Sequence, residues 1–541
     1  MAAKLKAEQI VSIYNKLERD KDTLKSHWQE IADYIVPRRQ NVTTQLTPGG
    51  KRMSKIYDAT AIRALRIFAN GLYGHLTSQA YPWFDLTTKN KDLADSPAVK
   101  WWLSDTTERM RSAINASRAA QSLHELYTDL GWAGTGCMYI EPGKRYAINY
   151  QTLDISTVCI MEDANGVVDS VYRLARFSAR QCIQYWGNKC SEKIQKAYKE
   201  NKLNEMFDII HAVYPREDYD WNKRDTLNMP WAVRYVEKES KNELAESGLK
   251  VFPYCVPRWE KDTTEVYGRS PCMDILPDVK MLNQMCYDDM RAMQKRIDPP
   301  LLASKESALS TTRTTPGSVI YHKTGEPPQP MNFGGDIKLA FEAENQRRVA
   351  IEKGLYTDLF LLLAQSNDAN KTATEVRELI EEKITLLGPA LSRLQTELFD
   401  PMLSTTFQIL YSAGFIMPAP QELLGEGLEV EYVGRLALAM KQTETRAAIA
   451  TLGLAGNIAQ FAPDVLDNFD TDEIAIGTAM RNGMPIKYIR PPDVRDQIRQ
   501  QRAEEAAKQQ QAAMALEASK AMPGLSKAPE AGSPAEAMMG Q

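Results

Sequence analysis

In the first 135 residues, apolar side chains recur every three or four positions, which places them on one face of a helix. Helices are expected over residues 7–36, 61–76, about 97–114 and 123–132. Pro37 ends the first helix because proline lacks a backbone donor, and Asp58 can cap the start of the second. The beginning of the chain is therefore predicted to be helical.

Between residues 137 and 260 the pattern changes to alternation, which indicates β-strands. The turn-forming stretch 163–166 separates two alternating apolar runs, and this arrangement predicts a β-hairpin. Further strands are expected over residues 206–214, 231–236 and 251–259. The first half of the chain thus places helices first and a sheet after them.

Two long helices are predicted around the centre of the chain. Ser270 and Pro271 start a short helix, and a longer one restarts at Pro277 and runs to Asp298, before a Pro-Pro pair. Its apolar stripe consists of Val279, Leu282, Cys286, Met290, Met293 and Ile297. Its other face carries Lys280, Asp288, Asp289, Arg291, Lys295 and Arg296.

An insert over residues 301–335 separates this helix from a second one, expected over 336–363. The insert contains a Ser/Thr-rich stretch, a predicted strand over 318–322 and a Pro/Gly-rich loop. Each helix would be roughly 30–40 Å long at the standard rise. The pair is predicted to form an antiparallel rod with a small β knob at its tip.

Residues 364–371 form a polar loop, after which Thr372 and Glu375 fit a capping box. The helix that starts there is expected to run to about Ser412, with a kink at Gly388-Pro389. Beyond it the pattern predicts short helices, a strand over 428–433, a polar helix over 491–522 and a Pro/Gly/Ala-rich end. The predicted fold class is α+β, mainly α.

Length and composition narrow the class of protein. The chain has 541 residues, of which 43% are hydrophobic and 25% charged, as expected for a globular protein of about two to four folding units. A net charge of −4 does not suit a protein that grips duplex DNA, but it allows one that encloses DNA. Without the apolar core of a signal peptide or a membrane span, an aqueous, cytoplasm-like setting is expected.

Residues that could carry chemistry form no catalytic constellation. The seven cysteines are odd in number and include no CxxC pair, which favours buried free thiols over disulfides or zinc ligands. No GxxxxGK[ST] phosphate loop is present, and the glycines of 131–136 follow a helix, so they are interpreted as a helix end. The acidic pair Asp288-Asp289 is interpreted as a solvated face or an intersubunit contact. We expect no enzymatic activity, cofactor or metal.

The order of these elements, together with several short motifs, resembles the portal (head–tail connector) family of short-tailed, podovirus-like bacteriophages. The motifs are Tyr81-Pro-Trp83-Phe84, Val266-Tyr267-Gly268-Arg269-Ser270-Pro271, Leu276-Pro277-Asp278-Val279-Lys280 with Leu282-Asn283, Pro299-Pro300-Leu301 and Thr372-Ala-Thr374-Glu375-Val376. The resemblance covers about residues 7–500, and the order and spacing of the motifs carry it.

The resemblance implies a portal fold with named parts. Residues 1–270 would form the wing, 271–298 the first stem helix, 299–335 the clip, 336–360 the second stem helix, 361–372 the tunnel loop, 373–420 a long kinked wing helix, 421–522 the helical crown and 523–541 a disordered tail.

The resemblance also implies an assembly and its partners. Twelve copies would form a ring at one capsid vertex, and double-stranded DNA would pass through it without sequence-specific contacts. Large terminase, a tail adaptor, and the major capsid and scaffold proteins would bind the ring, which would assemble in the host cytoplasm, without a membrane, and stay in the virion. A helix pair that is apolar along one stripe also favours a ring, because identical neighbours can cover that stripe.

Three groups of residues are candidates for these contacts. The tunnel loop would contact the DNA backbone through Gln365, Ser366, Asn367, Asp368, Asn370 and Lys371. The clip would contact terminase and adaptor through Lys305, Arg313, His322 and Lys323. Charges of the stem that face the channel would be Lys280, Lys338, Arg347 and Arg348. The alternatives for the first two groups are an exposed interhelical turn and a solvated loop.

Another phage structural protein, such as a scaffold or a tail adaptor without a DNA channel, is the alternative class. It would account for the helices but not for the β-rich block over 137–260 or the proline-bounded insert. A DNA-processing enzyme would need a carboxylate or nucleotide site, and the sequence offers neither.

Overall fold

The structure is a computed structural model in which the chain divides into two compact units, residues 1–440 and 441–541. It describes residues 5–297 with short gaps between 40 and 54, 91 and 95, and 218 and 224; residues 301–302, 329–330 and 337–364; residues 387–433 without 424–426; parts of 450–479; and residues 492–521. Within these residues, no helix is long and apolar enough to span a bilayer.

The N-terminal helical region contains two helices where one was predicted. They are α1 (Ala7–Asp20) and α2 (Asp22–Tyr34), and the chain turns between them at Lys21. The side chain of Lys21 is buried, and its Nζ donates to the backbone oxygens of Ser156 and Val158 at 2.9 and 2.8 Å. The prediction of one helix over 7–36 was wrong because these distant partners do not appear in local periodicity.

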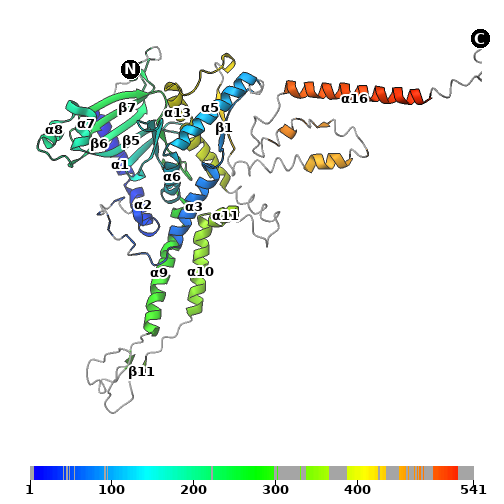
Figure 1. The fold of residues 1–541 in the computed structure, drawn as a ribbon. Coiled ribbons are helices and arrows are strands. Elements are labelled where there is room, and N and C mark those ends of the chain that lie inside the picture. Colours follow the sequence, from blue (N-terminus) through cyan, green and yellow to red (C-terminus); the bar gives the residue numbers. More distant parts are fainter. Residues whose placement is uncertain are drawn as a thin grey trace, which may run out of the picture. The chain divides into compact units, whose positions relative to one another are not determined.

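The next three helices follow the prediction closely. They are α3 (Thr60–Leu76), α5 (Pro97–Ala116) and α6 (Ala119–Ala133). Asp58 accepts a hydrogen bond from the Thr60 backbone at 2.7 Å, as expected of a residue at a helix start. Gly134 ends α6 with φ +75°, which confirms the interpretation of this glycine stretch as a helix end. Figure 1 shows α3 and α6 beside each other next to the sheets.

Two antiparallel sheets lie between residues 138 and 255. The larger has the order β4-β5-β6-β7-β8 and the smaller the order β3-β2-β9. Their strands are β2 (Met138–Pro142), β3 (Ile148–Thr152), β4 (Val158–Glu162), β5 (Val168–Ser178), β6 (Met206–Pro215), β7 (Trp231–Glu237), β8 (Glu243–Leu249) and β9 (Tyr254–Cys255). The predicted hairpin is confirmed, since β4 and β5 pair around a turn in which Gly166 has φ +79°.

Several elements were not predicted. The β-rich block also contains the helices α7 (Ala179–Trp186) and α8 (Glu192–Lys199), which pack on the larger sheet. The strand β1 (Phe84–Thr88) is also new and pairs with β12 (Leu428–Tyr432), which confirms the predicted strand over 428–433, so segments far apart in the first unit form one ladder. Short 3₁₀ turns occupy Pro37–Arg39, Ile155–Thr157, Gly187–Lys189, Thr226–Asn228 and Gln421–Leu423.

The helix α9 (Pro271–Ile297) is continuous, although a restart at Pro277 was predicted. A proline inside a helix removes one hydrogen bond and costs about 3 kcal/mol. The residues on either side of this turn, Ile275, Leu276 and Val279, are buried in the main core. Their packing outweighs the local cost, so the predicted interruption is absent.

The second helix of the pair ends earlier than predicted. It consists of α10 (Ile337–Gly354), and a separate helix α11 (Thr357–Ala364) follows. Between them Tyr356 has φ +54°, a left-handed conformation that an aromatic residue adopts only when tertiary contacts hold it. Its ring lies near Phe68 and Trp259, with ring centroids 6.5 and 6.0 Å away. These contacts break a helix whose sequence reads as continuous.

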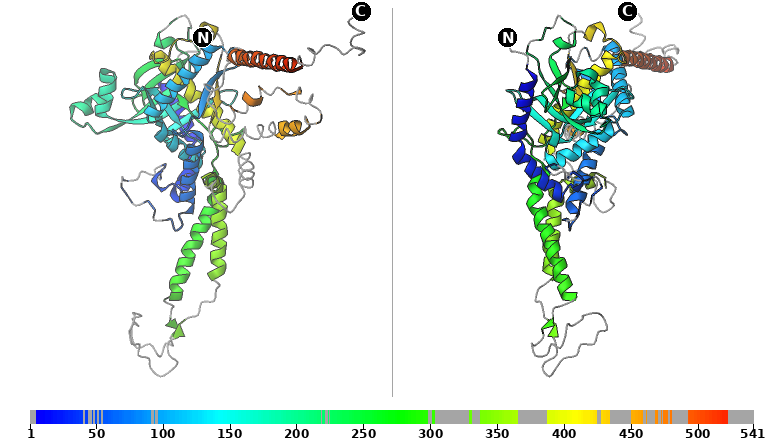
Figure 2. Two further views of the ribbon diagram at one scale, coloured as in Figure 1. Left: turned by 45° about the vertical axis from the view of Figure 1, so that its right-hand side comes forward. Right: turned by 90° about the vertical axis from the view of Figure 1, so that its left-hand side faces the viewer.

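At the far end of α9 and α10, the two-residue strands β10 (Leu301–Leu302) and β11 (Gln329–Pro330) pair with each other. This ladder agrees with the predicted β character of the insert, whose expected strand over 318–322 lies outside the described residues. Figure 2 shows α9 and α10 side by side in its left view and one in front of the other in its right view, extending away from the sheets.

The chain is helical again from residue 387, passes through a π-helical turn at Gln395–Phe399, and continues as α13 (Asp400–Ser412). A kink was predicted at Gly388-Pro389, but the described residues start only one position earlier and are helical there. The observed irregularity lies at the π turn, where Glu397 pairs with the buried Arg258. The capping box at Thr372 and Glu375 lies outside the described residues.

The second unit contains α16 (Pro492–Ala521), which confirms the predicted polar helix over 491–522. Residues 450–458 are also helical. The observed fold is mixed helix and sheet and mainly helical, as predicted from the sequence.

Candidate functional site: the hairpin of α9 and α10

The motif at 266–271 fastens the start of α9 to the rest of the first unit. The backbone N–H of Gly268 donates to Thr135 Oγ1 at 2.8 Å, and a Cβ at Gly268 would lie 2.5 Å from the Gly134 oxygen. Ser270 Oγ donates to the Trp132 oxygen at 2.9 Å and lies 3.1 Å from the Met273 nitrogen, which it caps. The motif therefore fixes where α9 leaves the core.

The hairpin has two regions with different surroundings. We call residues 266–289 and 344–356 the root, and residues 290–297 and 337–343 the distal part. In the root, Val279 and Leu282 are buried, as the predicted apolar stripe requires. In the distal part the same stripe is exposed, with Met290 at 44% and Ile297 at 84% exposure, and Phe341 of α10 at 43%.

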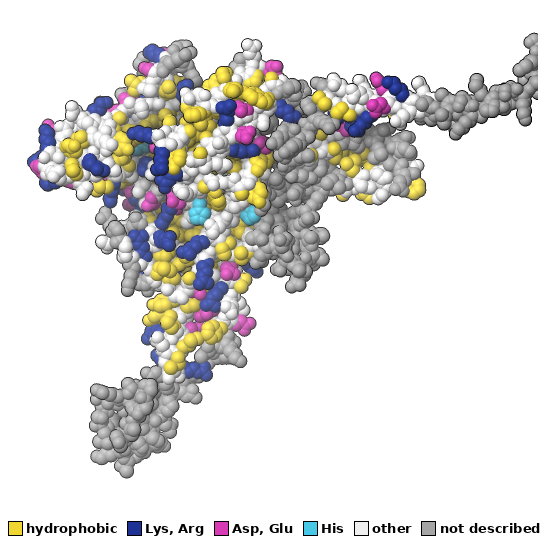
Figure 3. All heavy atoms as spheres, viewed as in Figure 1, with side chains coloured by type: hydrophobic (Ala, Val, Ile, Leu, Met, Phe, Trp, Pro, Cys, Tyr) yellow, Lys and Arg dark blue, Asp and Glu magenta, His cyan; other side chains and the backbone are white. Residues whose placement is uncertain are grey.

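Charged residues accompany the apolar stripe along both regions of the hairpin. Figure 3 shows hydrophobic and basic side chains interspersed along the visible face of the projecting helices. Of the predicted stem charges, Lys280 pairs with Glu30 of α2, and Arg347 pairs with Asp278 across the hairpin at 2.8 Å. Both pairs are half exposed, so each contributes little to stability.

Arg348, another predicted stem charge, lies at the centre of an ionic cluster in the root. Its Nε donates to Asp58 Oδ2 at 3.0 Å, and its Nη2 donates to Glu344 Oε2 at 2.8 Å. Although partial burial raises the pKa of Asp58, hydrogen bonds from Thr60 and Arg348 hold it below its ordinary value. The cluster joins α10 to the start of α3.

Asp289 of α9 adds a third acid to this cluster, beside Asp58 and Glu344. Its Oδ2 is buried and accepts no hydrogen bond from the described residues. Partial burial and the neighbouring carboxyl of Glu344 raise the pKa of Asp289. Two neighbouring carboxyls form a hydrogen bond only when one of them holds a proton. The acid predicted to be a solvated face or an intersubunit contact therefore lies against a buried acid of its own chain.

Asn283, a residue of the family-like motif, fastens the segment before α3 to the root. Its Oδ1 accepts from the Tyr57 backbone at 2.7 Å, and its Nδ2 donates to the Lys55 oxygen at 2.8 Å.

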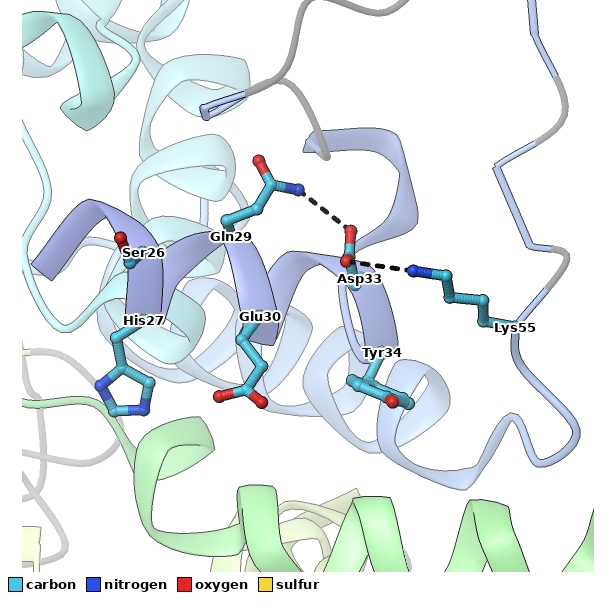
Figure 4. Close-up of a pocket in the computed structure, with 7 residues that line it drawn as sticks. All are labelled: Ser26, His27, Gln29, Glu30, Asp33, Tyr34 and Lys55. Atoms are coloured by element: carbon cyan, nitrogen blue, oxygen red, sulfur yellow. Dashed lines mark hydrogen bonds and ion pairs between the residues drawn. The ribbon is translucent and has the colours of Figure 1, made fainter. Parts of the chain in front are cut away.

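Nearby, a shallow depression follows one face of α2 and is lined by Ser26, His27, Gln29, Glu30, Asp33, Tyr34 and Lys55. Figure 4 shows Gln29 and Lys55 directed at Asp33, whose carboxylate accepts a hydrogen bond from Gln29 and forms an ion pair with Lys55.

The remaining predicted contact residues are not brought together by the described parts of the chain. The tunnel-loop candidates from Gln365 to Lys371 and the clip candidates Lys305, Arg313, His322 and Lys323 lie outside the described residues. Residues 361–364, counted with the tunnel loop in the prediction, still belong to α11. For Lys338 the structure describes the helical backbone alone.

Sequence reasoning missed a buried arginine that has several partners among the described residues. Arg258 is 2% exposed and pairs with Glu162 and Glu397. Its guanidinium also donates to the backbone oxygens of Val266 and Gly166 at 3.2 and 3.0 Å. It therefore joins the motif before α9, the β4–β5 turn and the π turn. Its partners are spread along the chain, so no local pattern could have found it.

The cysteines agree with the sequence-based expectation. All seven are free thiols, of which six are buried and Cys286 is partly exposed. Cys286 lies in the root, 3.6 Å from Arg348 Nη2, and burial raises its pKa to about 11. A neutral thiol at this place acts as a small apolar group.

The fold and the hairpin define a mainly helical protein with a projecting helix pair, and comparison with known proteins gives its family. Residues 7–489 match the model of the family described as "Bacteriophage head to tail connecting protein". The chain therefore belongs to this family, and the resemblance drawn from the sequence motifs is confirmed.

Two curated relatives agree with the family. The chain is 34% identical over 528 residues to the "Probable portal protein" of Bordetella phage BPP-1, which covers 95% of this chain and 94% of that protein. It is 30% identical over 524 residues to the "Portal protein" of Salmonella phage epsilon15, with 95% and 93% covered.

Solved structures add little. Two of them, titled "Virion of native gene transfer agent (GTA) particle" and "Neck of empty GTA particle computed with C6 symmetry", align with 78% of this chain and 95% of their own chains. The identity is 14% in both, and the TM-scores are 0.30 and 0.32. Scores this low support no argument about the fold or assembly of this chain.

Proposed function

We propose that this chain is one subunit of a portal ring, a non-enzymatic conduit for double-stranded DNA at one vertex of a phage capsid. The observation that carries the proposal is the match to proteins named as portal proteins over 95% of the chain. The ring would serve genome packaging, retention and ejection, and would remain part of the virion.

The hairpin supplies the physical support for a ring. Met290, Ile297 and Phe341 are exposed in the distal part, where the described residues of the same chain provide no cover. A row of large exposed apolar side chains can be covered by an identical neighbouring subunit. In a closed ring with rotational symmetry, every subunit is covered in the same way. Twelve copies is the number we propose.

The parts of the ring follow from the element order. Residues 1–270 and 373–420 would form the wing, α9 and α10 the stem, residues 299–335 the clip, and 421–522 the crown. The tunnel loop would begin where α11 ends at Ala364 rather than at residue 361. The stem would then present a helix pair toward the channel in every subunit.

DNA contacts in such a ring would be made to the phosphate backbone. The candidates are the tunnel-loop residues from Gln365 to Lys371 and the stem residues Lys280, Lys338 and Arg347. Lys280 and Arg347 each have an acidic partner in the same chain, so they would guide DNA without holding it. Arg348 binds Asp58 and Glu344, and we assign it a role in holding the root rather than in contacting DNA.

Replacing Lys371 with Glu tests the DNA contact. A ring of twelve subunits would lose twelve cations at one level of the channel, and the DNA retained in filled heads should decrease. Retention equal to the parent phage would contradict a role for this loop. DNA retention by the Lys280→Glu variant, which changes a stem cation that is already paired with Glu30, serves as the comparison.

The clip would dock large terminase during packaging and the tail adaptor afterwards, with Lys305, Arg313, His322 and Lys323 as candidate contacts. A ring that lacks residues 303–328 should fail to capture either partner in a pulldown. Capture of both partners by that ring would contradict the assignment.

Ring formation itself is tested by mass and shape. Twelve subunits of 61.0 kDa give a particle of roughly 0.7 MDa, which negative-stain images should show as a ring with a central hole. A filament or a compact small oligomer would favour the alternative class, a scaffold or tail adaptor without a channel.

A further inference from the structure

A fully buried carboxylate lies outside the hairpin, near the C-terminal end of α6. Asp129 is 0% exposed, and its Oδ1 accepts from Trp132 Nε1 at 2.9 Å. The same oxygen pairs with Arg39 Nη1 at 2.7 Å. The other oxygen, Oδ2, is buried and has no partner among the described residues. An ionised carboxylate in this position is held by one cation and one indole N–H.

Arg39 ends the short 3₁₀ turn Pro37–Arg39, and its side chain is 28% exposed, so it can reach water. The described residues between 42 and 57, which we call the strap, follow it along the chain. The strap binds α2, where Gln29 Oε1 accepts from the Thr43 backbone at 2.9 Å. It also reaches the root of the hairpin, through Asn283. Arg39 is therefore the anchor at which the strap begins.

The charged groups around Asp129 make its ionisation costly. Burial raises the pKa of Asp129 to about 6, although Arg39 and Trp132 act in the opposite direction, and Asp154 raises it further. Glu125, on the same helix, raises the pKa of Arg39 through its negative charge. The neighbouring Cys137 stays neutral, because burial raises its pKa to about 12. Arg39 is the cation on which the ionised form of Asp129 depends.

We propose that Arg39 and Asp129 form an acid-sensitive latch, in which Arg39 is docked while Asp129 is ionised and is released, together with the start of the strap, when Asp129 takes up a proton. The reason is thermodynamic linkage: docking of the guanidinium stabilises the carboxylate, so Asp129 binds a proton more tightly when Arg39 has left. Docking expels the proton, and acidification therefore favours release.

The latch would connect pH to the root of the hairpin. The strap touches α2 through Thr43, close to Arg39, and touches Asn283 of α9 through Lys55 and Tyr57, so the latch lies on the same segment as a contact of the root. Neutral Asp129 can remain buried, since an uncharged carboxyl costs far less to bury than an ion. This property goes beyond the proposed conduit and does not require a ring.

Hydrogen–deuterium exchange of the full-length protein, followed by mass spectrometry of peptides covering residues 35–57, tests the latch. Between pH 8 and about 6, protection of this segment should fall by up to about tenfold per pH unit after correction for intrinsic exchange. Below about pH 6 it should level off, because Asp129 then holds its proton whether or not Arg39 is docked. Equal protection at pH 8 and pH 5 would overturn the proposal.

Three variants distinguish the pH-dependent release of Arg39 from a general loss of stability. Asp129→Asn should show low protection of residues 35–57 at every pH, and Arg39→Gln should do the same. Arg38→Gln is the matched control, because Arg38 is the adjacent arginine, has an exposed side chain, and should keep the pH dependence of the parent protein. If Asp129→Asn retains that pH dependence, the assignment is wrong. Should Asp129→Asn fail to fold by circular dichroism, Arg39→Gln decides alone.

Discussion

The root and the distal part of the hairpin belong to the same two helices but are stabilised differently. In the root, Leu282 is buried, and Arg348 binds Glu344 of its own helix and Asp58 from a distant part of the chain. In the distal part, Ile297 is 84% exposed, and the described residues of the chain provide no further cover. The root is covered within one chain, whereas the distal part exposes the apolar surface that a neighbour would cover in the proposed ring. A pair of variants matched across the two regions, and two pairs of neighbouring charges within the root, can break or sharpen this comparison.

The largest difference is expected for apolar truncation. Leu282→Ala removes a buried side chain from the root and should lower the free energy of unfolding by about 2–5 kcal/mol. Ile297→Ala makes a similar change where the side chain is exposed, and should alter the unfolding of the isolated chain by less than about 0.5 kcal/mol. Urea unfolding of both variants measures the difference. Equal losses would mean that the distal part is covered within the chain.

A smaller difference is expected for the two adjacent arginines. Arg348→Leu leaves the buried Glu344 and the partly buried Asp58 without their cation. It should cost about 2–3 kcal/mol, less than the loss of a fully buried pair. Arg347→Leu breaks a half-exposed pair with Asp278 and should cost at most about 1 kcal/mol. Thermal unfolding at one pH compares them, and a reversed order would refute the role given to Arg348.

The smallest effect concerns pH. The pKa of Asp289 is raised in the folded state, so the contribution of this acid to stability is present at low pH and is lost as the pH rises through that pKa. Asp289→Asn removes the titrating acid, so the variant does not lose this contribution as the pH rises. Its free energy of unfolding should therefore exceed that of the parent at higher pH, by less than about 1 kcal/mol because the site is partly exposed.

Unfolding of Asp289→Asn from pH 4 to 8 measures this gain. Asp288→Asn changes the same charge one residue away, on the exposed face, and serves as the control. The same pH profile in both variants would exclude a proton shared between Asp289 and Glu344.

The sequence predicted elements that depend on local periodicity and missed what distant contacts decide. The helices α3, α5, α6 and α16 and the β4–β5 hairpin were predicted because their signals lie within a few residues. The breaks at Lys21 and Tyr356, and the absence of one at Pro277, arise from burial against segments far along the chain. Periodicity carries no information about such partners.

The same limit applies to the candidate site. The family resemblance and the charge of the side chain placed Arg348 with Lys280, Lys338 and Arg347 as a channel-facing residue. Its partner Asp58 lies 290 positions earlier in the chain, so only the fold reveals that it belongs to the root. The family, in contrast, was predictable, because motifs such as 266–271 are set by close backbone packing at Gly268 and Gly134 and therefore depend on particular residues.

The measurement that tests the account most directly is the particle mass of the parent chain and of the double variant Met290→Glu, Ile297→Glu. Both substitutions lie on exposed positions, so the chain should fold as before, but charges would replace the apolar surface that a neighbour is expected to cover. Mass photometry should give roughly 0.7 MDa for the parent and 61.0 kDa or small oligomers for the variant. A folded parent that stays monomeric at high concentration, or a variant that still forms the full ring, would contradict the claim that identical neighbours complete the hairpin.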